Sequence, residues 1–79
     1  MRSKDSARRF GEVVRKHRKA AGLTQEQLAE KADLASKMIS FVERFERNPS
    51  LNVADSIAQG LGIPLWKLIR DADSLKRKK

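Results

Sequence analysis

The stretch TQEQLAEKADLASKMISFVER, residues 24–44, decides the fold of this chain. Thr24 has the side chain of a helix N-cap, and Gln27 follows three residues later, as in a capping box. Leu28 and Ala29 then form an apolar inward face, and Leu34 marks a turn. This pattern predicts a short helix over about residues 24–32 that ends in a tight turn.

The second half of the stretch predicts another short helix, over about residues 35–45. Ile39 and Val42 continue an apolar face at a spacing of three residues. Ser36 is the side chain that could cap this helix, because Ala35 cannot. The outward positions are polar, basic or aromatic, namely Ser36, Lys37, Ser40 and Phe41. Two helices of this kind predict a helix-turn-helix.

The stretch resembles the helix-turn-helix of the lambda-repressor/Cro-like (XRE-type) family. The segments GEVVRKHRKAAGLTQEQLA, residues 11–29, and ERNPSLNVADSIAQGLGI, residues 46–63, resemble the family's neighbouring helices and loop. The likeness covers about residues 8–70 and implies an all-α, five-helix DNA-binding domain. Short bacterial and phage regulators, among them the controller proteins of restriction–modification systems, have this layout. Phe45 stands where the family commonly has Gly, so the end of the helix over 35–45 is expected to be longer or packed differently.

Composition favours a polyanionic partner. The chain has 79 residues, 18 Lys plus Arg, no cysteine and a formal net charge of +8. This charge fits nucleic acid or a membrane surface, but no apolar run reaches the roughly 20 residues that a membrane span needs. The N-terminal segment MRSKDSARRF lacks the apolar core of a signal peptide, so we expect a cytoplasmic protein.

The remaining segments complete one domain. We expect residues 1–5 to be flexible, residues 6–71 to form the DNA-binding domain with a C-terminal dimerisation helix, and residues 72–79 to be a basic, disordered tail. Ser50 is predicted to cap a fourth helix that ends at Gly62. The apolar face of that helix is expected to be Leu51, Ala54, Ile57, Ala58 and Leu61.

No arrangement of residues in the sequence predicts an enzyme. There is no cysteine, no second histidine and no Gly-rich phosphate loop, so we expect no catalytic residues, no metal and no cofactor. His17 could be a pH switch or a ligand, but a lone histidine lacks co-ligands. A partly buried side chain on the first helix is the favoured interpretation.

Two sets of residues are candidates for DNA contacts. Side chains expected at base edges are Ser36, Lys37, Ser40 and Phe41. The resemblance to controller proteins implies a base contact for Arg47 as well, although Arg47 could equally hold a phosphate. Thr24 and Gln25 are expected at a phosphate because they begin the second helix. The resemblance implies a second phosphate contact around the loop after the third helix, through Arg44, Asn48 and Ser50. The resemblance also implies that Arg18 pairs with Glu43, which would tie the first helix to the recognition helix.

The fifth helix carries more apolar groups than a small domain needs. Leu65, Trp66, Leu68 and Ile69 follow one another over about one and a half turns. We therefore expect a two-fold dimer interface centred on Leu65, Trp66 and Ile69, since Trp is enriched at interface hot spots. The alternative is that Trp66 folds back and seals the monomer.

The favoured function is a homodimeric, sequence-specific transcriptional regulator of double-stranded DNA that reads a pseudo-palindromic operator. The first alternative is an antitoxin with secondary DNA binding, whose partner would be a toxin. Non-specific binding of RNA or membrane through the basic surface is a third interpretation. It leaves the ordered pattern over residues 24–50 unexplained.

Overall fold

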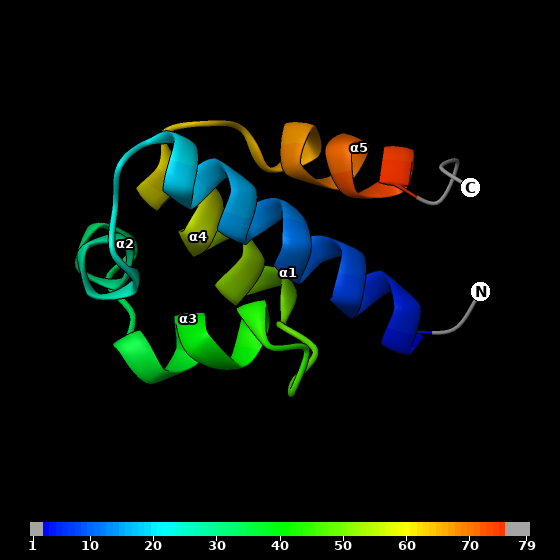
Figure 1. Cartoon of the computed structure of the whole chain (residues 1–79), viewed down its shortest axis with the longest axis horizontal. Coiled ribbons are helices and arrows are strands. Elements are labelled where there is room, and N and C mark those ends of the chain that lie inside the picture. The colour runs from blue at the N-terminus through cyan, green and yellow to red at the C-terminus, as the bar shows by residue number, and fades with distance from the viewer. Residues whose placement is uncertain (1–2, 76–79) are drawn as a thin grey trace.

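Across residues 3–75, the part that the computed structural model describes, the chain forms five α-helices and no strand. The helices are α1 (Ser3–Ala20), α2 (Gln25–Ala32), α3 (Ser36–Glu43), α4 (Leu51–Leu61) and α5 (Leu65–Leu75). Helix α1 lies between α3 and α5 and packs against both (Figure 1). The all-α, five-helix prediction is therefore confirmed. None of the helices in this part of the chain is long and apolar enough to cross a bilayer.

Local capping residues start two of the helices as predicted. The Thr24 hydroxyl accepts a hydrogen bond from the backbone N–H of Gln27 at 3.0 Å. The Gln27 side chain accepts one in return from the backbone N–H of Thr24 at 2.9 Å. Ser50 accepts from the backbone N–H of Val53 at 3.1 Å and begins α4. These bonds satisfy donors that a helix N-terminus leaves unpaired.

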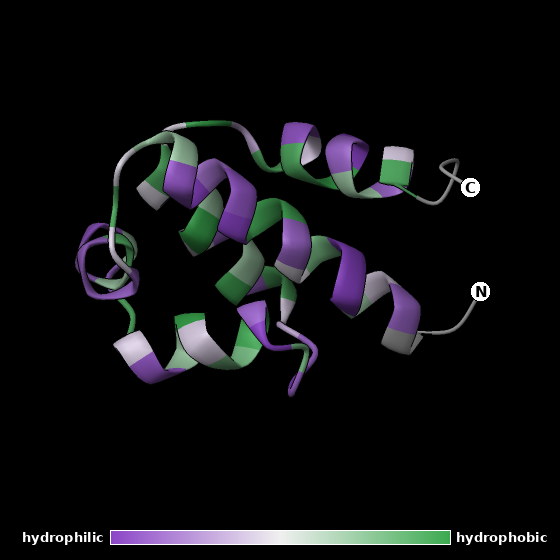
Figure 2. Ribbon diagram, in the orientation of Figure 1, coloured by the Kyte–Doolittle hydropathy of each residue, from purple (hydrophilic) through white to green (hydrophobic). Residues whose placement is uncertain are grey.

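The core lies where the inward faces of all five helices meet. Figure 2 shows hydrophilic and hydrophobic residues interleaved along each helix, as expected for helices with one buried face. The fully buried side chains include Val14, Leu28, Ile39, Val42, Ile57 and Leu68. Leu68 was expected among the surplus groups of α5, but it completes this core. Leu51 was expected on the inward face of α4, but it is 74% exposed, because the rotation of α4 against its neighbours turns this position toward water.

The helices at both ends are longer than predicted. Helix α1 begins at Ser3, so residues 3–5, which were expected to be flexible, lie within a helix. Helix α5 continues to Leu75 because Ala72 is buried against the core, so residues 72–75 do not belong to a disordered tail. The rest of the predicted flexible ends, residues 1–2 and 76–79, lies outside the described residues.

Helix α3 is shorter than predicted and ends at Glu43. Phe45 adopts a left-handed backbone with φ of 64°, which a helix cannot contain and which glycine usually occupies. Its ring lies against Gly11 of α1, where an added Cβ would approach the Val42 carbonyl oxygen to 2.3 Å and the Phe45 ring to 3.1 Å. The close approach of α1 to the end of α3 therefore depends on a residue without a side chain at position 11.

Candidate nucleic-acid interface

The turn between α2 and α3 sets the direction of the recognition helix. Asp33 ends α2 in the left-handed conformation, with φ 59° and ψ 45°, and its N–H reaches the carbonyls of Ala29 and Glu30. Aspartate tolerates this conformation better than most residues. Ala35 then stands at the N-cap of α3 without a side-chain hydrogen bond, and Ser36 is the first helical residue. Ser36 therefore does not cap the helix, which corrects the earlier expectation.

Helix α3 is buried on one side and open on the other. Ile39, Val42 and Glu43 face the protein interior. On the other side Ser36 and Lys37 are exposed, while Ser40 and Phe41 are half-buried. A short helix with a buried stripe and an outward row of hydrogen-bonding side chains has the form of a helix that enters a major groove.

The outward row of α3 shares a hollow with the start of α2. The hollow has a volume of about 500 Å³, and its lining includes Thr24, Gln25, Ser36, Lys37 and Ser40. Because the backbone N–H groups at the start of α2 carry the positive end of the helix dipole, they favour an anion at this edge. Five of the predicted DNA-contact residues therefore lie together.

Of the remaining predicted contacts, Phe41 lies in the last turn of α3, and the others follow the end of that helix. Arg44, Asn48 and Ser50 are exposed, and the Arg44 Nη2 atom lies 3.5 Å from the Glu46 carboxylate. The guanidinium carbon of Arg47 lies 4.8 Å from the centre of the Phe41 ring. The five predicted phosphate contacts thus fall into two groups, one at the start of α2 and one in the segment that follows α3.

A buried ion pair between α1 and α3 lies behind this surface. Arg18 donates to Glu43 twice, from Nε to Oε2 at 2.7 Å and from Nη2 to Oε1 at 3.0 Å. Arg18 also donates from Nη1 to the Leu23 carbonyl at 2.8 Å. Hydrogen bonding to Glu43 raises the pKa of the Arg18 guanidinium above its ordinary value, so the arginine is charged at any working pH. The pair implied by the family resemblance is present and links α1 to α3.

The ion pair has a third member that the sequence did not reveal. The Gln25 side chain at the start of α2 donates from Nε2 to Glu43 Oε1 at 3.1 Å. Gln25 and Glu43 are 18 residues apart, so no local pattern predicts this bond. It couples the orientation of a predicted phosphate contact to the buried carboxylate of the recognition helix.

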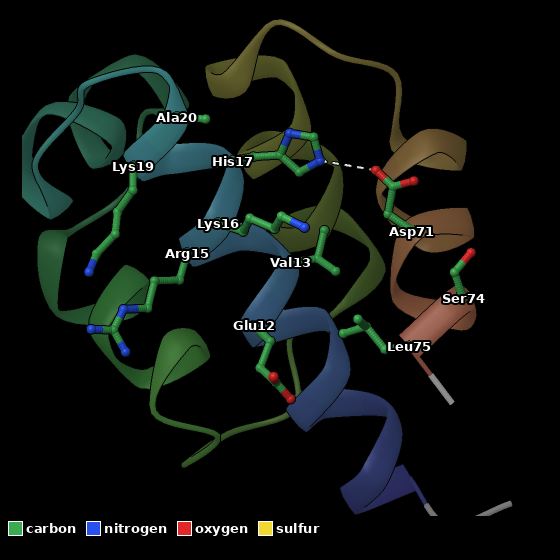
Figure 3. A pocket seen from close by; sticks show the side chains of 10 residues that line it. All are labelled: Glu12, Val13, Arg15, Lys16, His17, Lys19, Ala20, Asp71, Ser74 and Leu75. Atoms are coloured by element: carbon green, nitrogen blue, oxygen red, sulfur yellow. Dashed lines mark hydrogen bonds and ion pairs between the residues drawn. The ribbon is translucent and has the colours of Figure 1, made fainter. Parts of the chain in front are cut away.

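A separate groove lies between α1 and α5, away from this surface. His17 on α1 reaches across to Asp71 on α5, and the His17 Nε2 and Asp71 Oδ2 atoms are 3.0 Å apart (Figure 3). Arg15 and Lys19 point away from this contact (Figure 3). In the part of the chain that the structure describes, no cluster of histidine and carboxylate side chains could hold a metal ion. The histidine therefore serves here as a link between helices.

This link predicts an acid-dependent loss of stability. The neighbouring His17, and to a smaller extent Arg70, lowers the pKa of the Asp71 carboxyl below its usual 3.8. Because the folded-state pKa lies below the unfolded one, the stabilisation is present above the unfolded value and is lost as the pH falls through the folded value. We expect Asp71→Asn to lower the urea midpoint near neutral pH, and the difference from the unmodified protein to vanish at acid pH below 3.8. Glu30→Gln, at an exposed site on α2, is the control and should leave the midpoint nearly unchanged.

Comparison with known protein families and curated proteins gives a consistent result. Residues 14–65 match the helix-turn-helix family. Control protein C.MunI from a Mycoplasma species is 39% identical over 66 residues, which cover 82% of this chain and 89% of that protein. The immunity repressor of Bacillus phage phi105 is 36% identical over 66 residues, which cover 84% of this chain. The chain spans only 46% of that repressor's length.

Solved structures share the same architecture. The restriction–modification controller protein C.AhdI from Aeromonas hydrophila superposes with a TM-score of 0.76 at 37% identity, covering 78% of this chain and 94% of that one. The controller protein C.Esp1396I superposes with a TM-score of 0.87 at 28% identity, covering 94% of this chain and 95% of that one. The similarity to both therefore extends over most of the five-helix domain.

Proposed function

This chain belongs to the helix-turn-helix family, and we propose that it is a sequence-specific transcriptional regulator that binds double-stranded DNA as a homodimer. The observation that carries the proposal is the placement of Ser36, Lys37 and Ser40 in one hollow with the start of α2. The similarity to a phage repressor and to controller proteins supports a regulator more than an antitoxin. The cytoplasm is the compartment that this function requires.

We propose that α3 reads the bases and that the segments on either side of it hold phosphates. Ser36, Lys37 and Ser40 meet base edges in the major groove. Phe41, in the last turn of α3, and Arg47, in the loop that follows, extend this surface. Thr24 and Gln25 hold a phosphate on one side, while Arg44, Asn48 and Ser50 hold another on the far side. Phosphate contacts position the protein, and base contacts select the sequence.

Selection of bound sequences from a random duplex pool tests the proposal directly. A dimer with one recognition helix per subunit should enrich a pseudo-palindrome whose half-sites are centred about 10–10.5 base pairs apart, or a multiple of this. Failure to enrich any sequence at a salt concentration where the protein still binds DNA would contradict sequence-specific regulation.

Replacement of Lys37 should separate specificity from affinity. We expect Lys37→Ala to lower the ratio of specific to non-specific affinity, because a base contact contributes about 1–3 kcal/mol of discrimination. Gln25→Ala and Arg44→Ala should weaken operator and random DNA alike, as phosphate contacts do. Lys31→Ala, which removes the same charge from an exposed site on α2, is the matched control. If Lys37→Ala loses the same affinity on operator and on random DNA, Lys37 contacts the DNA backbone and not a base.

The binding constant should fall steeply with salt. Each phosphate neutralised by the protein contributes a slope of roughly −0.9 to log K against log of the salt concentration. With the cations Lys37, Arg44 and Arg47 at the proposed interface of each subunit, the dimer should show a slope of several units, measured by fluorescence anisotropy on labelled duplex. A nearly flat dependence would count against DNA as the partner.

The dimer is proposed to form through α5. Trp66 is 63% exposed and Ile69 49%, so Trp66 does not seal the monomer. Leu65 is half-buried and packs partly on the core, which leaves it at the edge of this face. Ile69 also lines an apolar hollow of about 360 Å³ opposite Leu51 of α4. Exposed apolar groups gathered on one side are the usual sign of a protein interface.

A further inference from the structure

Phe41 and Arg47 form a cation–π pair at the end of the recognition helix. The Arg47 guanidinium carbon lies 4.8 Å from the centre of the Phe41 ring, well within the range of a cation–π contact. Phe41 belongs to α3, whereas Arg47 belongs to the loop before α4. The ring therefore holds a side chain that no helix constrains.

The geometry points to one role for this pair: we propose that Phe41 is a positioning residue that holds Arg47 for bidentate contact with a guanine. Phe41 lies one turn beyond Lys37, so the Arg47 guanidinium continues the outward row of α3. The inference rests on the proposed DNA-binding function. It adds a role for Phe41 to the base contact already proposed for Arg47.

The cation–π contact itself favours a base contact. A guanidinium that lies over an aromatic ring uses its flat face for the contact and keeps the N–H groups along its edge available. That edge matches the O6 and N7 acceptors of guanine in the major groove. A phosphate needs only positive charge nearby, which a free arginine or lysine supplies as well. Ordering the long side chain before DNA arrives also lowers the entropic cost of binding.

In the part of the chain that the structure describes, Arg47 forms no ion pair with a carboxylate that would compete with the ring. The Glu46 side chain is engaged by Arg44, at 3.5 Å. The second aromatic ring at this end of α3, that of Phe45, lies 5.9 Å from the guanidinium carbon of Arg8 and packs against Gly11 of α1. Each ring thus faces its own arginine, and only Phe41 lies on the outward side of the recognition helix.

The test compares three variants on the operator and on random duplex DNA. Arg47→Lys keeps the charge but loses the paired N–H donors of the guanidinium. The ratio of specific to non-specific affinity should therefore fall by about five- to 100-fold. Phe41→Leu keeps an apolar side chain and removes the ring, so the same ratio should fall by about two- to fivefold. The double variant should lose little more than Arg47→Lys alone, because the ring acts only through the arginine.

A measurement without DNA separates this inference from the proposed function. Protons of the Arg47 side chain should show an upfield ring-current shift in the NMR spectrum, which Phe41→Leu abolishes. Phe45→Leu, which removes the other ring, is the matched control and should leave that shift in place. Unchanged Arg47 signals in Phe41→Leu would overturn the positioning role, whatever the protein binds.

Two binding outcomes would also overturn it. Equal losses on operator and random DNA for Arg47→Lys would assign Arg47 to a phosphate. Additive losses from Phe41→Leu and Arg47→Lys would show that the ring does not act through the arginine. An unmodified protein without any sequence preference would contradict the proposed function, and with it the base contact, even if the ring-current shift is present.

Discussion

Replacing Glu43 by Leu is expected to lower the free energy of unfolding by about 3–5 kcal/mol, which is the usual cost of leaving one partner of a buried pair alone. The side chains of Arg18 and Glu43 are only 11% and 3% exposed. Without the carboxylate, the Arg18 guanidinium would be left buried with the Leu23 carbonyl as its partner. The loss is a large share of the roughly 5–15 kcal/mol that stabilises a typical domain.

The pair should behave as a coupled unit. Arg18→Met should cost about as much as Glu43→Leu, whereas the double variant should recover most of the loss, because apolar replacement of both partners is often neutral. Urea unfolding at one fixed protein concentration measures all four members of this cycle. Purely additive losses would show that the two side chains do not stabilise one another.

The chain provides an exposed pair for comparison. Arg44 and Glu46 lie 3.5 Å apart with side chains 59% and 49% exposed. The equivalent cycle, Arg44→Met with Glu46→Leu, should return a coupling energy of about 0–1 kcal/mol. A coupling as large as that of the buried pair would mean that burial is not the cause of the Arg18–Glu43 effect.

Features that depend on neighbours in the chain could be predicted from the sequence. The capping box of Thr24 and Gln27 and the cap at Ser50 require only residues within one turn of each other. The left-handed Asp33 follows from the short turn that joins two helices. The outward row of α3 follows in the same way from helical spacing around Ile39 and Val42.

Features that depend on packing between distant segments could not be predicted from local pattern. His17 and Asp71 are 54 residues apart, and Gln25 and Glu43 are 18 apart. The exposed Leu51 and the buried Leu68 are both leucines on amphipathic helices. Only the rotation of each helix against its neighbours decides which one faces water. The Arg18–Glu43 pair is equally non-local, and the family resemblance supplied it.

Helix α3 ends earlier than predicted, although the unusual residue at position 45 is visible in the sequence. Phe45 occupies a position that commonly holds glycine, and a longer helix was one of two expected results. The helix instead ends at Glu43, and Phe45 keeps the left-handed backbone that glycine would adopt. Contact of its ring with Gly11 of α1 offsets part of the conformational cost.

Substitution of Trp66 and Ile69 by Glu is expected to split the dimer into folded monomers. Both side chains are largely outside the core, so charges there should spare the monomer fold. Leu65 is left unchanged, because it packs partly on the core and its loss would confuse dissociation with unfolding. If these are interface hot spots, each substitution should raise the dimer dissociation constant by about 30-fold or more.

Sedimentation equilibrium measures the dissociation constant, and circular dichroism shows that the helices remain. Lys67→Glu is the matched control, because it changes the net charge by the same two units on a different side of α5. We expect it to leave the dimer intact. If Lys67→Glu dissociates the protein as strongly as the double variant, charge and not the apolar face would control assembly.

DNA binding should weaken when the dimer dissociates, because the dimer sets the spacing of the two recognition helices. A two-fold axis beside α5 would pair two copies of α3, and the two helices would enter successive major grooves about 34 Å apart. A monomer engages one half-site and loses the contribution of the second, so the folded double variant should bind a complete operator no better than an isolated half-site. The unmodified protein should bind the complete operator far more tightly than a half-site. If it sediments as a monomer at tens of micromolar and still binds a single half-site tightly, recognition does not require a dimer and the α5 interface is wrong.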